Sequence, residues 1–257
     1  MTALRFDGTE VRFGGFALST GSVAMRSGCV TVLLGPNGGG KTTALRLAAG
    51  LLRPTAGSVT IDGEPVHAMP AARRARKVAM VVQRPQVSAP FSAIEVVELG
   101  AVATGGGPTT AREALALVGL GPRADIPFAL LSGGEQQRVA LARAFHQHRP
   151  GGVLLLDEAF AAVDPPEAAA IVSGLRARAA AGATVLVATH DLALASALAD
   201  EVWCIGGGRS LGFGAATDLL APASLGGLLG IAAVTAHGSR GPIATADLAT
   251  MLPRHGA

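Results

Sequence analysis

The chain has 257 residues, of which 49% are hydrophobic and 15% are charged, and its formal net charge is +3. This composition supplies enough apolar side chains for a substantial buried core, which excludes a largely disordered chain. A net charge this small gives no reason to expect a nucleic-acid partner. No apolar run approaches the ~18 residues of a membrane span, and the first residues lack a signal-peptide pattern.

The two cysteines, Cys29 and Cys204, both fall in segments that are predicted to be buried strands. Reduced thiols in a core need no oxidising compartment, so we expect a cytoplasmic protein. At this length we expect one large α/β domain with an inserted subdomain.

The first 84 residues alternate strand and helix patterns. Short apolar and β-branched runs predict strands over 23–25, 29–34, 58–61 and 78–82. Helix-forming runs predict a helix that begins after residue 40 and ends before Pro54, and a short basic helix over 71–77. The basic residues of that second helix are interpreted as a solvated face, with membrane docking as a less favoured alternative.

From about 85 to 149 the pattern becomes helical. Ser92 with Glu95, and Thr110 with Glu113, fit the capping box that begins a helix, and a third helix is predicted to begin near residue 134. Beyond this stretch, strands are predicted over 153–156, 184–188 and 202–205, with helices over 166–181 and 192–199. Strands that alternate with helices indicate a mainly parallel sheet covered on both faces.

A glycine-rich run connects the strand predicted over 29–34 to the helix after it: residues 35–42 read Gly-Pro-Asn-Gly-Gly-Gly-Lys-Thr. They fit the G-x-x-x-x-G-K-[ST] phosphate loop, and the strand before and helix after them argue against a chance glycine turn. Glycines let backbone N–H groups surround phosphate oxygens, and the helix start adds its positive end. We expect nucleotide contacts from Gly35, Pro36, Asn37, Gly38, Gly39, Gly40, Lys41, Thr42 and Thr43.

Within this loop, Lys41 is expected to reach the β- and γ-phosphates and the Thr42 hydroxyl to ligate Mg²⁺. The sequence therefore predicts a protein that binds a nucleoside triphosphate.

Two adjacent carboxylates, Asp157 and Glu158, follow an apolar strand pattern. Ligands of open α/β sheets collect at the carboxyl ends of the strands, so these acids are expected at the nucleotide. Asp157 is assigned to Mg²⁺, through water, and Glu158, pointing the opposite way along the strand period, to the attacking water. The alternative is a solvated acidic strand end.

Residues 131–138, Leu-Ser-Gly-Gly-Glu-Gln-Gln-Arg, resemble the signature motif of ABC transporter ATPases. The phosphate loop, this motif, the acid pair and Ala-Thr-His-Asp at 188–191 occur in that family's order and spacing, and the resemblance covers about residues 4 to 220. It implies an α/β fold of the P-loop NTPase (RecA-like) class, in which a mainly parallel sheet carries N-terminal antiparallel strands and an inserted helical subdomain.

The resemblance also implies a domain division and an activity. The ABC ATPase domain is expected over 1–238, with a nucleotide-binding core of 1–84 and 150–238 and a helical subdomain over about 85–149. Residues 239–257 are expected to form a loosely ordered tail. The expected activity is ATP hydrolysis coupled to transport across a membrane, with ATP and Mg²⁺ as cofactors.

In the signature motif, Ser132, Gly133 and Gly134 precede a predicted helix, which presents amides and a hydroxyl to an anion. The resemblance implies that they close over ATP bound to another copy, giving a head-to-tail homodimer with two ATP molecules. Taken alone, the run is an ordinary helix N-cap.

Three further residues take roles from the resemblance. Gln83 is similar to the Q-loop glutamine, which senses Mg²⁺ and relays to membrane subunits. His190 is similar to the switch histidine, which contacts the γ-phosphate and holds the water. Asp164 is similar to the D-loop aspartate at the dimer seam. The implied catalytic residues are Lys41, Glu158 and His190, and the implied metal ligands are Thr42, Gln83 and Asp157.

The chain also departs from the family pattern. It contains no tyrosine, so the tyrosine that stacks on adenine is absent, and Phe13 is the candidate replacement, with a core role as the less favoured alternative. Glu135 stands where many members have Gln, and Ala159 where Pro is usual.

The resemblance implies transmembrane permease subunits, contacted near Gln83 and the helical insert, at the cytoplasmic face of the cell membrane. A substrate-binding protein is a further expected partner. Residues 71–83 are similar to importers of iron-siderophore, haem or cobalamin, and residues 157–164 to zinc and manganese importers. Metal or metal-chelate import is therefore favoured. A soluble ABC ATPase, such as an iron–sulfur cluster assembly partner, and an exporter ATPase remain alternatives.

Overall fold

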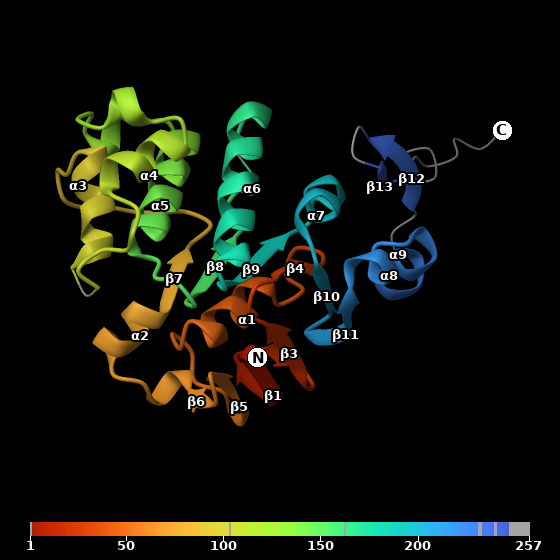
Figure 1. Cartoon of the computed structure of the whole chain (residues 1–257). Helices are drawn as coiled ribbons and strands as arrows, with labels where there is room; N and C mark the ends of the chain where they lie inside the picture. Colours follow the sequence, from red (N-terminus) through yellow and green to blue (C-terminus); the bar gives the residue numbers. More distant parts are fainter. Residues whose placement is uncertain (1, 103, 162, 231–232, 239–240, 247–257) are drawn as a thin grey trace.

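The computed structural model describes residues 2–102, 104–161, 163–230, 233–238 and 241–246 (Figure 1). In this part of the chain, eleven strands form one sheet, in the order β6-β5-β1-β2-β11-β10-β4-β9-β8-β7, with β3 paired to β1. Their bounds are β1 (Thr2–Phe13), β2 (Phe16–Ser19), β3 (Val23–Arg26), β4 (Val30–Leu34), β5 (Ala56–Ile61), β6 (Glu64–Pro65), β7 (Val78–Val81), β8 (Val153–Asp157), β9 (Thr184–Thr189), β10 (Glu201–Gly206) and β11 (Arg209–Ala215).

Five neighbouring strands, from β7 through β8, β9 and β4 to β10, pair in parallel. Every residue of β4, β8 and β9 is buried, which explains their continuous apolar runs. The N-terminal strands β1, β2, β3 and β5 pair antiparallel. The predicted fold class is confirmed.

Helices cover both faces of the parallel strands (Figure 1). On one face Leu45 and Leu47 of α1 pack with Val153 and Leu155, and on the other Leu175 of α6 belongs to the cluster that holds the alternate positions of the same strands. The α-helices are α1 (Lys41–Ala48), α2 (Ala71–Lys77), α3 (Ala93–Glu98), α4 (Ala111–Leu117), α5 (Gly133–Gln147), α6 (Pro165–Ala180), α7 (Leu192–Leu198), α8 (Ala216–Leu219) and α9 (Pro222–Leu229).

Short 3₁₀ turns complete the helical elements: η1 (Val66–Ala68), η2 (Leu99–Ala101), η3 (Gly121–Arg123) and η4 (Phe128–Leu130). Helices α3, α4 and α5 contact one another and lie together at one end of the molecule (Figure 1). Capping boxes begin all three helices, at Ser92, Thr110 and Ser132, and those at Ser92 and Thr110 were expected from the sequence.

The strands that the local sequence patterns missed include β1, β2 and β11. In β1, Leu4 and Phe6 are buried while Arg5 and Asp7 are exposed, so only one face of this strand is apolar. The pairing of β1 with β5 also shifts register between Asp7 and Glu10. A half-solvated, irregular strand carries a weak local pattern, and its position depends on pairing with distant strands.

The predicted tail also needs correction. Residues 241–246 form β13 (Gly241–Ala246), which pairs antiparallel with β12 (Ala233–Gly238). Val234 in β12 and Ile243 in β13 are β-branched residues that favour strands, a pattern that the low overall complexity of the segment obscured. Residues 239–240 and 247–257 of the predicted tail lie outside the described residues.

One of the two cysteines, Cys29, is less buried than the sequence predicted. Cys204 is buried in β10, and burial raises its pKa to about 11. Cys29 lies one residue before β4 and is partly exposed, and partial burial raises its pKa less strongly. Both side chains are free thiols.

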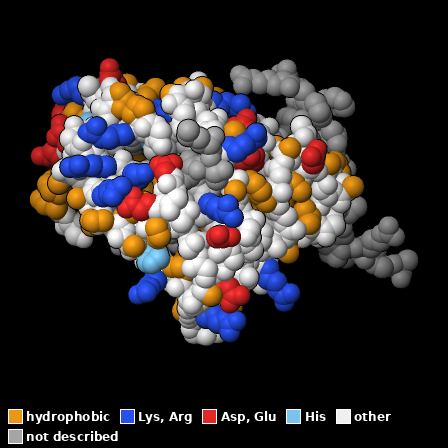
Figure 2. Space-filling model, turned by 60° about the horizontal axis from the view of Figure 1, so that its bottom comes forward, with side chains coloured by type: hydrophobic (Ala, Val, Ile, Leu, Met, Phe, Trp, Pro, Cys, Tyr) orange, Lys and Arg blue, Asp and Glu red, His pale blue; other side chains and the backbone are white. Residues whose placement is uncertain are grey.

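The surface in Figure 2 carries Lys and Arg side chains with Asp and Glu side chains among them. On α2, Arg73 pairs with Glu64 at 2.8 Å and Lys77 with Asp62 at 2.7 Å. These pairs favour the interpretation of α2 as a solvated face. Among the described residues, no helix has the length and apolar character to cross a membrane.

The single tryptophan, Trp203, is fully buried against Phe6, with ring centroids 5.0 Å apart. We expect Phe6→Ala to lower the free energy of unfolding by about 3–5 kcal/mol, because it leaves a cavity beside the indole. Denaturant unfolding followed by Trp203 fluorescence measures this. Leu51→Ala, at a side chain 64% exposed, is the control; equal losses for both variants would contradict the packing described.

Candidate active site

The glycine-rich loop leaves β4 and enters α1 with a backbone that few residues could adopt. Gly40 has a φ of 110°, which favours glycine. At Gly35 a Cβ atom would lie 2.1 Å from the carbonyl oxygen of Ile205. The backbone of Gly35 therefore packs directly against Ile205 in β10, and this contact fixes the position of the loop.

Lys41 is buried at the first position of α1. Its ammonium donates to the carbonyl oxygens of Gly35 at 2.8 Å and Pro36 at 3.2 Å, and lies 3.2 Å from Glu158 Oε1. A lysine ammonium has three N–H donors, and these three oxygen contacts fix its position within the loop.

Glu158 follows the last residue of β8 with a φ of 48°, a left-handed conformation that is unfavourable for a non-glycine residue. Its N–H donates to the carbonyl of Ala188 at 3.0 Å. The alternation of the strand therefore stops at Asp157, and Glu158 does not simply point to the opposite face. Both carboxylates instead approach the start of α1.

The Glu158 carboxylate connects two predicted site residues. Oε2 lies 3.0 Å from His190 Nδ1 and Oε1 pairs with Lys41. The Glu158 side chain is 9% exposed, whereas that of His190 is 61% exposed. A buried carboxylate held beside an exposed histidine can accept a proton from a water molecule at that point.

Asp157 is buried, and burial raises the pKa of its carboxyl, an effect opposed by a hydrogen bond from Thr42. Its Oδ1 atom is buried and has no hydrogen-bond partner among the described residues. An unpartnered carboxylate oxygen beside a threonine hydroxyl is a set of hard oxygen donors that fits Mg²⁺. The described residues contain no cluster of three or more His, Cys, Asp or Glu side chains, so a cation here would need phosphate or water oxygens as well.

A cavity of about 430 Å³ lies above the loop. Its lining includes most of the predicted nucleotide contacts, together with Gln83, which lies two residues beyond β7. It is lined by Phe13, Phe16, Pro36, Asn37, Gly38, Gly40, Lys41, Thr42, Thr43, Gln83 and Glu158. Of the predicted loop contacts, Gly35 and Gly39 do not line the cavity.

Phe16 is the cavity residue that the sequence analysis missed. Its ring centroid lies 5.4 Å from that of Phe13, at 40°, and its Cζ atom lies 3.4 Å from where a Cβ on Gly40 would be. Phe13 itself is 48% exposed, which argues against a core role. The pattern Phe-Gly-Gly-Phe, two aromatic residues around a glycine turn, was the available clue.

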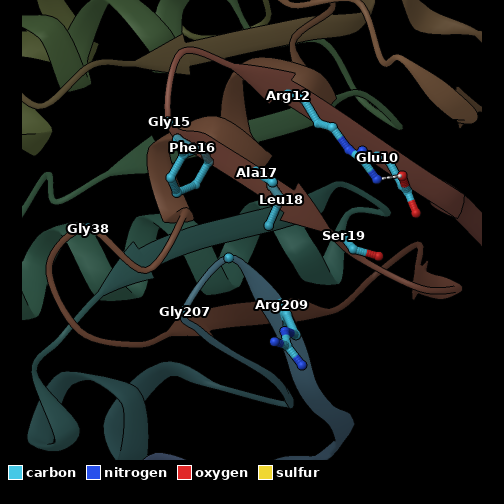
Figure 3. A pocket seen from close by; sticks show the side chains of 11 residues that line it. Glu10, Arg12, Gly15, Phe16, Ala17, Leu18, Ser19, Gly38, Gly207 and Arg209 are labelled. Atoms are coloured by element: carbon cyan, nitrogen blue, oxygen red, sulfur yellow. Dashed lines mark hydrogen bonds and ion pairs between the residues drawn. The ribbon is translucent and has the colours of Figure 1, made fainter.

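A second cavity, of about 450 Å³, adjoins the first, and both share Phe16 and Gly38 (Figure 3). Arg12 and Arg209 line it from two strands, and Arg12 pairs with Glu10 at 3.4 Å. It opens where β2 and β11 meet through a single bridge.

Ser132, Gly133 and Gly134 do not line the first cavity. Ser132 Oγ accepts from the Glu135 amide at 3.3 Å, and Glu135 Oε2 accepts from the Ser132 amide at 2.8 Å. Asp164, the N-cap of α6, is exposed and makes no capping bond. The fold thus gathers the loop, the acids, Gln83 and His190 in one place, but leaves the signature residues and Asp164 away from that cavity.

The similarity of this chain to known proteins agrees with this geometry. Residues 18–161 match the family described as ABC transporter. The chain is 40% identical over 225 residues to a hemin import ATP-binding protein of Pseudomonas entomophila, which covers 84% of this chain and 88% of the relative. It is 38% identical over 205 residues to a cobalamin import ATP-binding protein of Halobacterium salinarum, covering 77% and 51%.

Among solved structures, a dimeric ATP-binding cassette in a post-hydrolysis state, bound to ADP and phosphate, matches with a TM-score of 0.72 at 26% identity. The match covers 83% of this chain and 98% of that one.

Because the folded-state pKa of Asp157 is raised, its ionised form destabilises the nucleotide-free fold above that pKa and has no such effect below the unfolded pKa. We expect Asp157→Asn to raise the stability of the nucleotide-free protein at pH 8 by about 1 kcal/mol, or ~2–4 °C in Tm. The gain should vanish near pH 3, and Mg²⁺-dependent hydrolysis should be lost.

Calorimetry at both pH values, with a hydrolysis assay, measures this prediction. Asp125→Asn makes the same chemical change at an exposed position and should alter neither property. A destabilised Asp157→Asn protein at pH 8 would refute the assignment of Asp157 as an unfavourably buried charge.

Proposed function

The chain belongs to the ABC transporter family as an ATP-binding, ATP-hydrolysing subunit, and we propose that it powers the import of a metal chelate. The observation that carries the enzymatic part is the buried Glu158 carboxylate between the Lys41 ammonium and the His190 imidazole. The cargo follows from two relatives whose names specify import of hemin and of cobalamin. Both cargoes are metal ions held in large organic rings, which favours a chelate over a free metal ion.

Within this function, the loop amides and Lys41 bind the phosphates of ATP. Glu158 orients a water molecule and accepts its proton, and His190, hydrogen-bonded to the same carboxylate, fixes the position of the proton acceptor. Lys41 offsets the charge that develops on the terminal phosphoryl group. Mg²⁺, when bound by Thr42 and Asp157 with Gln83 nearby, would supply further positive charge to the phosphates. Phe13, with Phe16 beside it, would stack on adenine.

The signature residues act on a second copy of the chain in this proposal. In the described structure the amides of Gly133 and Gly134 make no hydrogen bond, and they begin a 15-residue helix whose positive end favours an anion. Asp164 is likewise free to reach across a dimer seam. The dimeric state of the ATP-binding cassette described above supports a head-to-tail homodimer.

Permease subunits would dock near Gln83 and the helical segment, which is proposed to form a subdomain over about 85–149 inserted between core segments 1–84 and 150–238. A hydrogen bond supports this coupling: Gln137 of α5 donates to the carbonyl of Val82 at 3.1 Å, one residue before Gln83. Nucleotide binding that moves Gln83 would therefore also displace α5 through this hydrogen bond. Such docking places the chain at the cytoplasmic face of the membrane, in a system with a substrate-binding protein.

We expect Glu158→Gln to bind ATP with nearly unchanged affinity, to accumulate as a dimer, and to hydrolyse ATP at least ~100-fold more slowly, because the proton acceptor is lost. Steady-state phosphate release and sedimentation with ATP measure these properties. Glu98→Gln, the same change at an exposed position, should behave as the unmodified chain. Hydrolysis within ~3-fold of normal in Glu158→Gln would remove Glu158 from this role.

Transport is tested in the organism that carries the chain. Deletion of its gene should abolish uptake of radiolabelled haem or cobalamin, and a gene encoding Glu158→Gln should not restore it, because import needs hydrolysis. Growth on a simple iron salt is the control and should be unaffected. Unchanged uptake of both chelates in the deletion strain, with normal ATPase activity of the purified chain, would reject the cargo and leave the ATPase standing.

A further inference from the structure

An ion pair lies beside the first turn of α5. Arg123, the last residue of η3, contacts Glu135 Oε1 through Nη1. The Glu135 side chain is 12% exposed and that of Arg123 is 52% exposed. The carboxylate is therefore largely removed from water, with the guanidinium on its outer side.

The same carboxylate is fixed to the signature residues through its other oxygen. Glu135 Oε2 accepts from the Ser132 amide at 2.8 Å, and the Glu135 amide donates to Ser132 Oγ at 3.3 Å. This capping box settles the backbone of Ser132, and it leaves the Ser132 hydroxyl proton and the amides of Gly133 and Gly134 for another acceptor. It also places a full negative charge one residue after Gly134 and two residues after Gly133.

An acidic residue in the first turn stabilises a helix by itself, because it satisfies the positive end of the helix dipole. A phosphate at that end meets the opposite situation, since the carboxylate repels it and has already taken up part of the positive potential. An uncompensated Glu135 would thus oppose the anion binding that the first turn otherwise favours.

Arg123 is placed to remove this conflict. Arg138, the cation within the signature motif, is engaged elsewhere: its Nη1 donates to the carbonyl of Val118 at 3.1 Å and lies 3.5 Å from Glu167. An ion pair as exposed as that of Arg123 contributes little to folding stability, so its main effect is on the local charge.

We propose that Arg123 is a positioning residue for ATP-driven closure: it neutralises Glu135 and so allows the first turn of α5 to accept the terminal phosphate of ATP bound to a second copy. This inference rests on the dimer of the proposed function. It assigns a role to a residue that lies eight positions before the signature motif, and it makes that role conditional on Glu at position 135.

The test uses the slow Glu158→Gln chain, in which the ATP concentration for half-maximal dimerisation can be measured by sedimentation. Adding Arg123→Ala should raise that concentration about tenfold at low salt, and the increase should shrink in 0.5 M NaCl because the repulsion is screened. Arg123→Lys should restore most of the affinity. Arg112→Ala, a change of the same charge at an exposed position of the helical segment, is the matched control.

The decisive variant combines Arg123→Ala with Glu135→Gln. If Arg123 acts through Glu135, the combination should dimerise as well as Glu135→Gln alone. An equal loss in both backgrounds, a loss that does not depend on salt, or no loss from Arg123→Ala would overturn the role of Arg123.

Failure of the dimer itself is separately visible. A Glu158→Gln chain that binds ATP, measured by titration calorimetry, yet stays monomeric would overturn both the dimer and this inference. A chain that dimerises while Arg123→Ala behaves like Arg112→Ala would overturn this inference alone.

Discussion

The site depends on three charged groups buried together at the carboxyl ends of parallel strands. Lys41, Asp157 and Glu158 are each at most 9% exposed. Charges buried in this way destabilise a fold unless they are paired and hydrogen-bonded. The ammonium is satisfied by two loop carbonyls and Glu158, which requires a loop that turns the carbonyls of Gly35 and Pro36 toward Lys41. The glycines of the loop follow from that requirement.

The acids are satisfied less completely than the ammonium of Lys41. Asp157 retains an unpartnered oxygen, and Glu158 is held in a left-handed conformation. Both features are unfavourable in the absence of a ligand, and such strain concentrates at sites where a ligand relieves it. The mainly apolar strands β4, β8 and β9 beneath the site, in which every residue is buried, supply the stability that tolerates it.

Polar contacts outside the cavity connect it to the rest of the molecule. His190 reaches the Glu158 carboxylate from the end of β9, and Gln137 ties α5 to the strand end that carries Gln83. The same helix presents the signature residues at its other functional surface, its N-terminus. Helix α5 therefore contacts the residue before Gln83 while its first turn keeps two amides without a hydrogen bond. Under the proposed function, this arrangement would transmit nucleotide binding between two copies and to membrane partners.

The sequence by itself determined whatever is written in consecutive residues: the phosphate loop, the acid pair after an apolar strand, the signature motif, two capping boxes and the parallel core. These features depend on backbone conformation and hydrophobic period, which neighbouring residues fix. Only the tertiary structure decided the direction of Glu158, the bond from Thr42 to Asp157, the position of Phe16, and the ion pair of Arg123 with Glu135. The tertiary structure also decided where the half-solvated strands β1, β2 and β11 form and pair. Each of these arises from packing between segments far apart in the chain, and no local pattern specifies which distant group a side chain will meet.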